Sequence, residues 1–242
     1  MRTDSAVHAT AHAVVLDIEG TTGSLSHVRD VLFPYARQRI APWLAARRGT
    51  AQWHQVLAAV RTRTSAPELG ELDAVEQLES WADADAKAVP LKTLQGLIWA
   101  DGYAAGELSG HVYPDVPTAL ARWKASGVAR YIYSSGSEPA QRAWFAHTPY
   151  GDLSDLLNGY FDLVSAGHKW EAASYRALAA AIGVPGPQLL FTSDVGEELG
   201  AASAAGWQTV AVRRPDDRRG PEVTGHRTIG SLDALELRPP RA

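Results

Sequence analysis

The sequence predicts an α/β protein whose core is a parallel sheet between helices, with a block of helices inserted after the first strand. Three observations predict this fold class. A short apolar run rich in β-branched residues ends at Leu16, residues 26–110 show helical patterns without a convincing strand, and strand-like and helical segments alternate afterwards. Strands that alternate with helices form parallel sheets through right-handed crossovers.

The first predicted strand covers residues 12–16 and leads directly into "DIEGTTGSLS", which begins with Asp17 and Glu19. A β-branched apolar run of this length is typical of a strand buried on both faces. An acid at the end of such a strand either serves a site or belongs to a polar turn. The residues next to Asp17 leave both possibilities open.

The inserted block contains apolar residues at helical spacing, and Pro34 must start or kink a helix there. We therefore expect a helical domain at residues 26–110, and a core domain made of residues 1–25 and 111–242. The helical segments of the block are expected at about 26–48, 50–63, 73–87 and 91–108.

In the second half, a helix from about Val116 to Ser126 is stopped by Gly127 and followed by the first of several strands. The tail adds a final strand and a short helix. The expected strands are 129–134, 160–165, 188–193 and 208–214, and the helices between them are 138–147, 171–183 and 195–206.

Composition excludes several functional classes. The net charge of −4 shows no basic surplus for nucleic acid or anionic lipid. Without cysteine there are no thiolate metal sites, Cys nucleophiles or disulfides, which fits a reducing compartment. The N-terminus lacks the plan of a secretory signal, and no apolar stretch reaches membrane-spanning length. We expect a soluble cytoplasmic protein, in which oxygen or imidazole groups would hold any metal.

Polar residues follow each predicted strand, where parallel sheets bind ligands. They are of the types that phosphoryl transfer needs: a carboxylate nucleophile, donors to phosphate oxygens, a cation and oxygen ligands for Mg²⁺. The residues are Asp17 with Glu19, Ser134, Ser135 and Ser137 around Gly136, Lys169, and Asp194 with Glu198.

Each of these residues alone has a simpler interpretation, as a turn, a helix cap or a solvated charge. Their occurrence in order at one edge of one sheet favours a site. Other features are assigned structural roles: His111 and His168 lack metal-ligand spacing, the tryptophans are expected in cores, and "RRPDDRR" (213–219) reads as a solvated loop.

These strand-end residues resemble the four motifs of the haloacid dehalogenase superfamily, with "DIEGTT" in place of Asp-x-Asp. The runs "VVLDIEGTTGSLSHVRDVLFPYARQRI", "LQGLIWADGYAAGELSGHVYPDVPTALARWK", "YIYSSGSEPAQ", "EAASYRALA" and "SDVGEELGAASAAG" are similar to the enolase-phosphatases of methionine salvage, also called acireductone synthases. The similarity extends from about Ala13 to Arg213. It implies a Rossmann-like α/β/α core with an inserted helical cap domain.

The resemblance also implies an activity and a set of roles. The family enolises and then dephosphorylates 2,3-diketo-5-methylthiopentyl 1-phosphate with one Mg²⁺, giving the dihydroxy acireductone, and a monomer is expected. By position, Asp17 would be the nucleophile and a metal ligand, and Glu19 would bind metal through its carbonyl. The remaining roles are Asp194 as metal ligand, Ser134 and Ser135 on the phosphate, Lys169 as its neutralising cation, and Gly136 and Glu198 in support.

Two departures affect this assignment. Glu19 is one methylene longer than the usual second Asp, and we hypothesise that it serves the enolisation. His168 and Trp170, in "GHKWEAASY", stand where the family pattern has Pro and a basic residue, which affects substrate contacts but not the charge of Lys169. The alternatives are a capped phosphatase for another small phosphate ester, or a noncatalytic binding protein on this scaffold.

Overall fold

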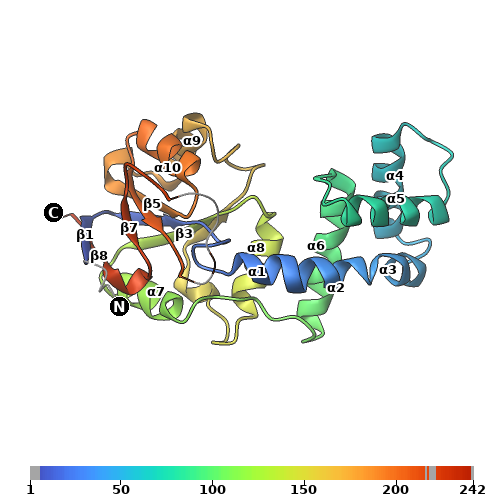
Figure 1. Ribbon diagram of the computed structural model, residues 1–242, viewed down its shortest axis with the longest axis horizontal. Coiled ribbons are helices and arrows are strands. Elements are labelled where there is room, and N and C mark those ends of the chain that lie inside the picture. The colour runs from blue at the N-terminus through green and yellow to red at the C-terminus, as the bar shows by residue number, and fades with distance from the viewer. Residues whose placement is uncertain (1–5, 216, 218–221, 241–242) are drawn as a thin grey trace. The chain divides into compact units, whose positions relative to one another are not determined.

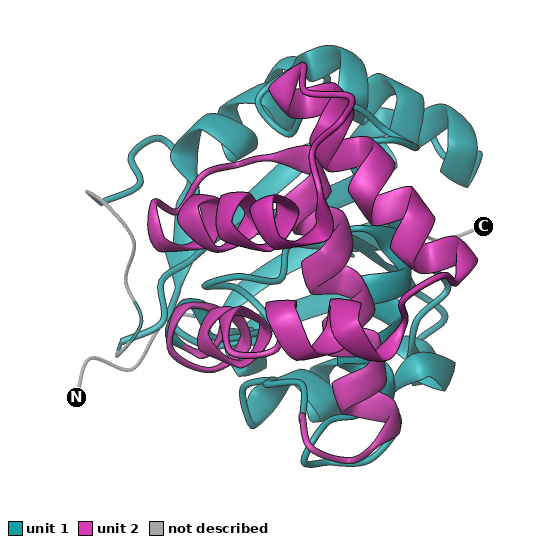
Figure 2. Cartoon of the chain, turned by 90° about the vertical axis from the view of Figure 1, so that its right-hand side faces the viewer, with its two compact units in different colours: residues 1–26, 109–242 teal, residues 27–108 magenta. Residues whose placement is uncertain are grey.

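The structure is a computed structural model that describes residues 6–215, 217 and 222–240. The chain forms two compact units, which Figure 2 shows in different colours. Unit 1 contains residues 1–26 and 109–242, and unit 2 contains residues 27–108. The two units are described separately below.

A six-stranded parallel sheet forms the centre of unit 1, with the strand order β4-β3-β2-β5-β6-β7. The parallel sheet that the alternating pattern predicts is therefore confirmed. Its strands are β2 (Ala13–Leu16), β3 (Ala129–Tyr133), β4 (Gly159–Phe161), β5 (Leu189–Ser193), β6 (Gln208–Val212) and β7 (Arg227–Ile229).

Helices cover both faces of this sheet. The chain moves from β2 to β3 and β4 in one direction, then returns to β5 and β6 in the other, so right-handed crossovers place α7 and α8 on one face and α9 and α10 on the other. In Figure 1, α9 and α10 lie together on one side of the strands and α7 on the opposite side. The helices are α7 (Asp115–Ala125), α8 (Glu138–Ala146), α9 (Ala172–Ile182) and α10 (Gly196–Ala204).

The register of the three central strands brings their polar ends to one edge. Leu16, the last residue of β2, pairs with Ile132 on β3 and with Thr192 on β5. All four residues of β2 are buried, as expected for a strand with neighbours on both sides and helices on both faces. The residues that follow β2, β3 and β5 therefore emerge at the same edge of the sheet.

Unit 1 differs from the sequence-based expectation in two places. A second, two-stranded parallel sheet joins β1 (Val7–Thr10) to β8 (Leu235–Arg238), and β1 was not predicted because its partner strand comes from the other end of the chain. Strand β4 is also shorter than the expected 160–165. The carboxylate of Asp162 accepts the N–H groups of Val164 and Ser165, which turns the chain away from the sheet. Short 3₁₀ turns cover Ser154–Leu156, Gly186–Gln188 and Leu232–Ala234.

Unit 2 is helical throughout its described residues. Pro34 lies in the first turn of α2, directly after a π-helical turn in which the N–H of Phe33 donates to the carbonyl of Val28. Thr50 caps α4 by accepting the N–H of Trp53. The elements are α1 (Leu25–His27), a π-helix (Val28–Leu32), α2 (Phe33–Arg37), α3 (Ile40–Ala46), α4 (Ala51–Thr64), α5 (Glu71–Asp83) and α6 (Val89–Ala104).

The core of unit 2 is apolar and includes Leu44, Leu57, Leu78, Leu94 and Ile98. Its four tryptophans belong to this core or pack against it, and three of them donate the indole N–H to a partner, as buried tryptophans usually require. The partners are Asp101 for Trp43 at 2.7 Å, Glu71 for Trp53 at 2.7 Å, and the carbonyl of Leu32 for Trp99 at 2.8 Å. Among the described residues, no helix is both long and apolar enough to span a bilayer.

Candidate active site

Asp17 lies directly after β2, at the centre of the sheet edge, and is only 4% exposed. Its backbone N–H donates to the carbonyl of Thr192 at 3.0 Å, which continues the pairing with β5. The hydroxyl of Thr22 donates to the Asp17 carbonyl at 2.8 Å. The side chain is therefore presented from a backbone that is fixed on both sides.

The ammonium of Lys169 joins two carboxylates at this edge. Its Nζ lies 2.6 Å from Oδ1 of Asp17 and 2.7 Å from Oε2 of Glu198. Glu198 also accepts the hydroxyl of Ser193 at 2.8 Å. Residues far apart in the sequence thus form one buried charged cluster, as expected from the strand ends.

Burial and charge act in opposite directions on this cluster. Burial alone lowers the pKa of Lys169, but the adjacent Asp17 and Glu198 raise it well above its ordinary value, so the ammonium stays charged. For Glu198, burial raises the pKa, and Lys169 only partly opposes this effect. The cluster therefore keeps a permanent cation beside the Asp17 carboxylate.

Two buried tyrosines hydrogen-bond the main chain around Lys169. Tyr175 is fully buried and its hydroxyl donates to the Lys169 carbonyl at 2.8 Å. The hydroxyl of Tyr133 donates to the carbonyl of Gly167 at 2.7 Å. Nζ of Lys169 lies 5.8 Å from the ring centroids of both Tyr133 and Phe191, a distance at which the ring faces favour a cation. The loop between β4 and α9 is thereby fixed although it is irregular.

Asp194 follows β5 and is buried beside Gly20, in the loop after β2. Gly20 has a φ of +77°, and a Cβ at this position would collide with Oδ2 of Asp194. Only glycine allows this close approach between the two loops. The loops that carry Asp17 and Asp194 are consequently packed against each other.

This arrangement suits a hard divalent cation by the chemistry of its donors. Two buried carboxylates, Asp17 and Asp194, and the backbone of Glu19 belong to adjacent loops, and Mg²⁺ prefers oxygen ligands of this kind, with few protein carboxylates. Within the described residues, no group of three or more His, Asp or Glu side chains could hold a metal, so Mg²⁺ here would also need the Glu19 carbonyl and water as ligands.

The loop after β3 begins with Ser134, which is buried, and continues with Ser135, which is exposed. The N–H of Gly136 donates to Oγ of Ser134 at 3.3 Å. The side-chain amide of Gln141 donates to the carbonyls of Gly136 and Phe161, at 2.7 and 2.8 Å. The loop is thus tied to α8 and β4.

The structure brings the predicted residues together to different degrees. Asp17, Lys169 and Glu198 are in direct contact, and Asp194 packs against the Asp17 loop. Ser134, Ser135 and Gly136 follow the neighbouring strand β3. Glu19 is half-buried and its backbone pairs with Gly23. His168 and Trp170 stack at 4.6 Å between ring centroids, and Trp170 is 61% exposed.

Two expectations were wrong. Trp170 is 61% exposed and does not lie in a core, because its ring stacks on His168 at the surface. In the run 213–219, Arg214 is buried and not solvated, because it is paired with Asp115 at 2.7 Å; Asp216, Arg218 and Arg219 lie outside the described residues. The sequence reasoning also missed Ser193 and Tyr175. Ser193 could have been found from its place next to Asp194, whereas no local pattern marks Tyr175 or Arg214.

Comparisons with known proteins agree with this geometry. A family model described as haloacid dehalogenase-like hydrolase matches residues 11–206. The Enolase-phosphatase E1 proteins of Streptomyces avermitilis and Nocardia farcinica are 46% and 48% identical, over 93% of this chain and 95% and 96% of theirs.

Solved structures share the fold. The UTR4 protein of Saccharomyces cerevisiae has a TM-score of 0.77 at 28% identity and covers 92% of this chain and 98% of its own. CbbY of Rhodobacter sphaeroides, at 15% identity and a TM-score of 0.61, covers 92% of this chain and 95% of its own, and shares the fold alone. With the acid-bearing strand ends of the sheet and relatives of nearly full length, the chain belongs to the haloacid dehalogenase-like hydrolases and, among them, to the enolase-phosphatase E1 family.

Proposed function

We propose that this enzyme converts 2,3-diketo-5-methylthiopentyl 1-phosphate into 1,2-dihydroxy-3-keto-5-methylthiopentene and inorganic phosphate, a step of methionine salvage. The observation that carries the proposal is the buried Asp17 carboxylate held 2.6 Å from Lys169 at the carboxyl ends of the central strands. Full-length similarity to proteins named Enolase-phosphatase E1 supports the choice of substrate.

Asp17 is the nucleophile of the phosphatase step. Its carboxylate attacks phosphorus, the bond from phosphorus to the ester oxygen breaks, and that oxygen leaves with its electron pair and takes a proton from water. Water then attacks the phosphorus of the aspartyl-phosphate, which releases phosphate and restores the carboxylate. Lys169 offsets the repulsion between the anionic nucleophile and the anionic substrate, which would be severe in a buried site.

Ser134 and Ser135 bind the phosphate of the substrate, with Gly136 in support. The Ser134 oxygen accepts the N–H of Gly136, and its hydroxyl proton can be donated to a phosphate oxygen. Glu198 supports the site by holding Lys169 from the side opposite Asp17. These residues bind and orient the phosphate without changing their own covalent state.

Asp17, Asp194 and the backbone carbonyl of Glu19 would hold one Mg²⁺, which supplies positive charge to the phosphate oxygens when bound. The close packing of Gly20 against Asp194 supports this assignment, because it keeps the two acid-bearing loops at a fixed separation.

Glu19 is our candidate for the proton abstraction next to the carbonyl. Its side chain is half-buried, two residues after the nucleophile, and is longer than the aspartate usual at this position. A substitution Glu19→Gln that impaired enolisation and dephosphorylation equally, with Mg²⁺ binding unchanged, would contradict this special role.

Unit 2 serves as the cap that excludes water from the reactive diketone. Its wholly helical make-up and its insertion between β2 and β3 support this assignment. We also propose a cytoplasmic monomer acting on a small molecule, without nucleic acid or membrane as a partner. The absence of cysteine and the net charge of −4 support the location and the class of partner.

The test is an assay with the diketo phosphate at varied Mg²⁺, following inorganic phosphate and enediol absorbance together. Wild type should give both signals, and Asp17→Asn should lower phosphate release by about 10⁴-fold or more, with an unchanged circular dichroism spectrum. Phosphate release without the enediol would favour a capped phosphatase for another ester. Intact Mg²⁺ binding without turnover would favour a binding protein.

A further inference from the structure

Arg214 lies two residues after β6 in a segment rich in charge, yet it is only 4% exposed. Its Nε and Nη2 both donate to the carbonyl oxygen of Thr21, at 2.9 and 2.6 Å. Its Nη1 donates to Oδ2 of Asp115 at 2.7 Å, and its guanidinium lies 4.1 Å from the centre of the Tyr113 ring. Every face of this side chain therefore has a defined partner in unit 1.

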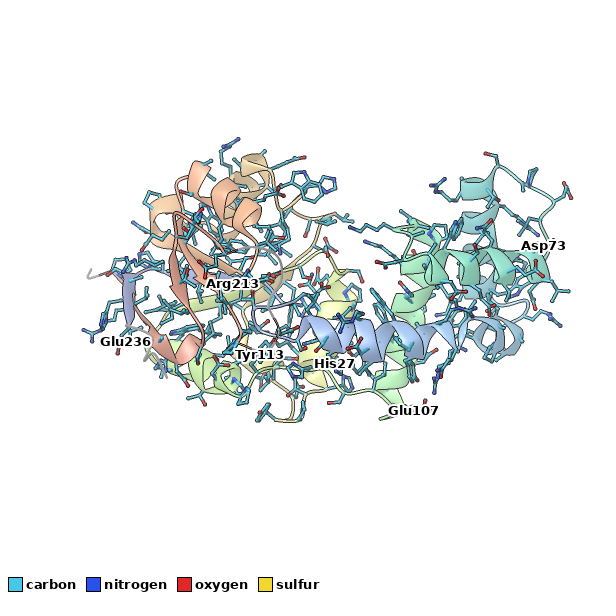
Figure 3. All side chains as sticks on the ribbon, viewed as in Figure 1. His27, Asp73, Glu107, Tyr113, Arg213 and Glu236 are labelled. Atoms are coloured by element: carbon cyan, nitrogen blue, oxygen red, sulfur yellow. The ribbon has the colours of Figure 1, made fainter. Side chains whose placement is uncertain are left out.

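Asp115, at the start of α7, is fixed by further donors. Its Oδ2 also accepts the hydroxyl of Ser231 at 2.8 Å and the N–H of Leu232 at 2.5 Å. Burial raises the pKa of Asp115, but Arg214 and these donors outweigh it and hold the pKa below its usual range. The pair is charged and anchored at its acidic end. In Figure 3, the labelled Tyr113 marks the chain just before α7, and the labelled Arg213 is the neighbour of Arg214.

Thr21 belongs to the loop that carries Asp17. The carbonyl of Ile18 accepts the N–H groups of Thr21, Thr22 and Gly23, so the loop closes on itself. The hydroxyl of Thr21 lies 3.5 Å from Oδ2 of Asp17, the oxygen not bonded to Lys169. Movement of the Thr21 peptide would therefore move a contact of the Asp17 carboxylate.

We propose that Arg214 is a positioning residue for Asp17, acting through the Thr21 peptide. This inference rests on the proposed function, in which Asp17 is the nucleophile. The fork of a guanidinium fixes both the distance and the direction of the carbonyl that it binds, whereas an ammonium fixes only a distance. The adjacent Arg213 donates to the carbonyl of Asp194 at 3.4 Å, so the segment after β6 contacts both acid-bearing loops.

A role in stability alone explains this pair poorly. A buried ion pair costs desolvation of both charges, and apolar residues of similar volume are often equally or more stabilising. A purely structural role of Arg214 can still be tested, because unit 1 contains a second buried arginine that serves as a control. Arg130 is 6% exposed, and it donates to the carbonyls of Leu156 and Val128, near the start of β3 and so at the opposite edge of the sheet.

The experiment compares Arg214→Lys with Arg130→Lys in the full chain, by steady-state kinetics with Mg²⁺ and by urea unfolding. Arg214→Lys should lower kcat for phosphate release by about 100-fold, the cost of misplacing a reacting group, while KM changes by less than about threefold. Arg130→Lys should reduce stability but leave kcat within about twofold of wild type. Equal kcat losses in the two variants, or an unimpaired Arg214→Lys, would overturn the inference.

Thr21→Val provides a second and independent readout, since it removes the hydroxyl and keeps the carbonyl. It should lower kcat by about tenfold, and its effect should not multiply with that of Arg214→Lys, because both act on the same contact with Asp17. Normal kcat in Thr21→Val, or multiplicative losses in the double variant, would reject the route through Thr21.

Asp17→Asn, measured in parallel, separates the role of Asp17 as nucleophile from the role of Arg214 as positioning residue. Activity that survives in Asp17→Asn rejects the nucleophile. An inactive Asp17→Asn beside an unimpaired Arg214→Lys rejects only the role of Arg214.

Discussion

The described ion pairs of the two units differ: unit 1 has buried pairs beside exposed ones such as Arg142–Glu138, and unit 2 has exposed ones. In unit 1, both side chains of the Lys169–Asp17 pair are 6% exposed, and those of the Arg214–Asp115 pair are 4% and 8% exposed. In the described ion pairs of unit 2, every arginine side chain is at least 29% exposed. The core of unit 2 is mainly apolar, and its buried polar groups include the side chain of Gln95 and the tryptophan N–H groups at its margin.

We interpret the buried ion pairs of unit 1 as fixing the positions of side chains and loops, and the exposed pairs of unit 2 as solvated surface charges. Burying an ion pair costs free energy that its attraction only partly returns, so burial alone does not favour such pairs. In unit 1 they lie at the sheet edge that carries Asp17 or contact its loop, where fixed geometry matters to the chemistry. In unit 2 they lie in water, where an ion pair stabilises a fold by about 1 kcal/mol or less.

Among the substitutions that remove one member of an ion pair, Lys169→Met should have the largest effect on stability and a large effect on activity. Asp17 and Glu198 would remain buried together without a cation, so the free energy of unfolding should fall by about 3–5 kcal/mol. Phosphate release should fall by about 10²- to 10³-fold, because the positive charge beside Asp17 is lost. Urea unfolding in the presence of a chelator and the phosphate assay measure the two effects.

Two control variants accompany this substitution: one separates charge from geometry at Lys169, and the other removes an exposed lysine elsewhere. Lys169→Arg keeps the charge and should retain most of the stability while activity stays low, because a planar fork differs from an ammonium. Lys124→Met removes an exposed lysine that bonds only the carbonyl of Asp155, and should change neither quantity. Wild-type stability in Lys169→Met would show that the buried pair does not stabilise the fold.

Asp115→Asn should have an intermediate effect that depends on pH. The amide can still accept the N–H of Arg214 but carries no charge, so we expect a loss of about 2 kcal/mol at pH 7. Because the pKa of Asp115 is lowered in the folded state, its contribution is present above the unfolded aspartate pKa of about 3.9 and is lost as pH falls through the folded value. The difference between wild type and variant should therefore shrink toward pH 3.

Denaturant unfolding at pH 7, 5 and 3 measures this difference. A difference that stayed constant from pH 7 to pH 3 would mean that Asp115 acts through packing and not through its charge. Ser231→Ala is the matched control, since it removes one donor to the same oxygen without removing a charge.

The sequence predicted those parts of the molecule that depend on local pattern. Apolar runs and glycine stops identified the strands, and the strand ends identified Asp17, Lys169 and Asp194, because a parallel sheet necessarily gathers its carboxyl ends. The helical block was expected at 26–110, and the compact unit runs from His27 to Leu108.

What escaped prediction depends on contacts between distant segments. Arg214 sits among charged neighbours and looks solvated, yet its partners Thr21 and Asp115 lie about 190 and 100 residues earlier in the chain. Strand β1 forms because β8, at the other end of the chain, supplies its hydrogen bonds. A sequence pattern reports on near neighbours and carries no information about such pairings.

Arg37→Gln should have the smallest effect and tests the other side of the comparison. Arg37 reaches Glu79 at 3.0 Å and Asp83 at 2.7 Å from a side chain that is 34% exposed, so it makes two ion pairs and still remains in water. Solvent screening and the cost of ordering long side chains cancel most of the attraction, and we expect a change in melting temperature of no more than about 2 °C. High salt should remove even that change, because the Debye length falls to about 3 Å at 1 M ionic strength. Calorimetry of wild type and variant at low and high salt measures it. If Arg37→Gln destabilised the protein as much as Lys169→Met does, exposure would not distinguish ion pairs with large and small effects on stability. Buried charge would then not mark the site.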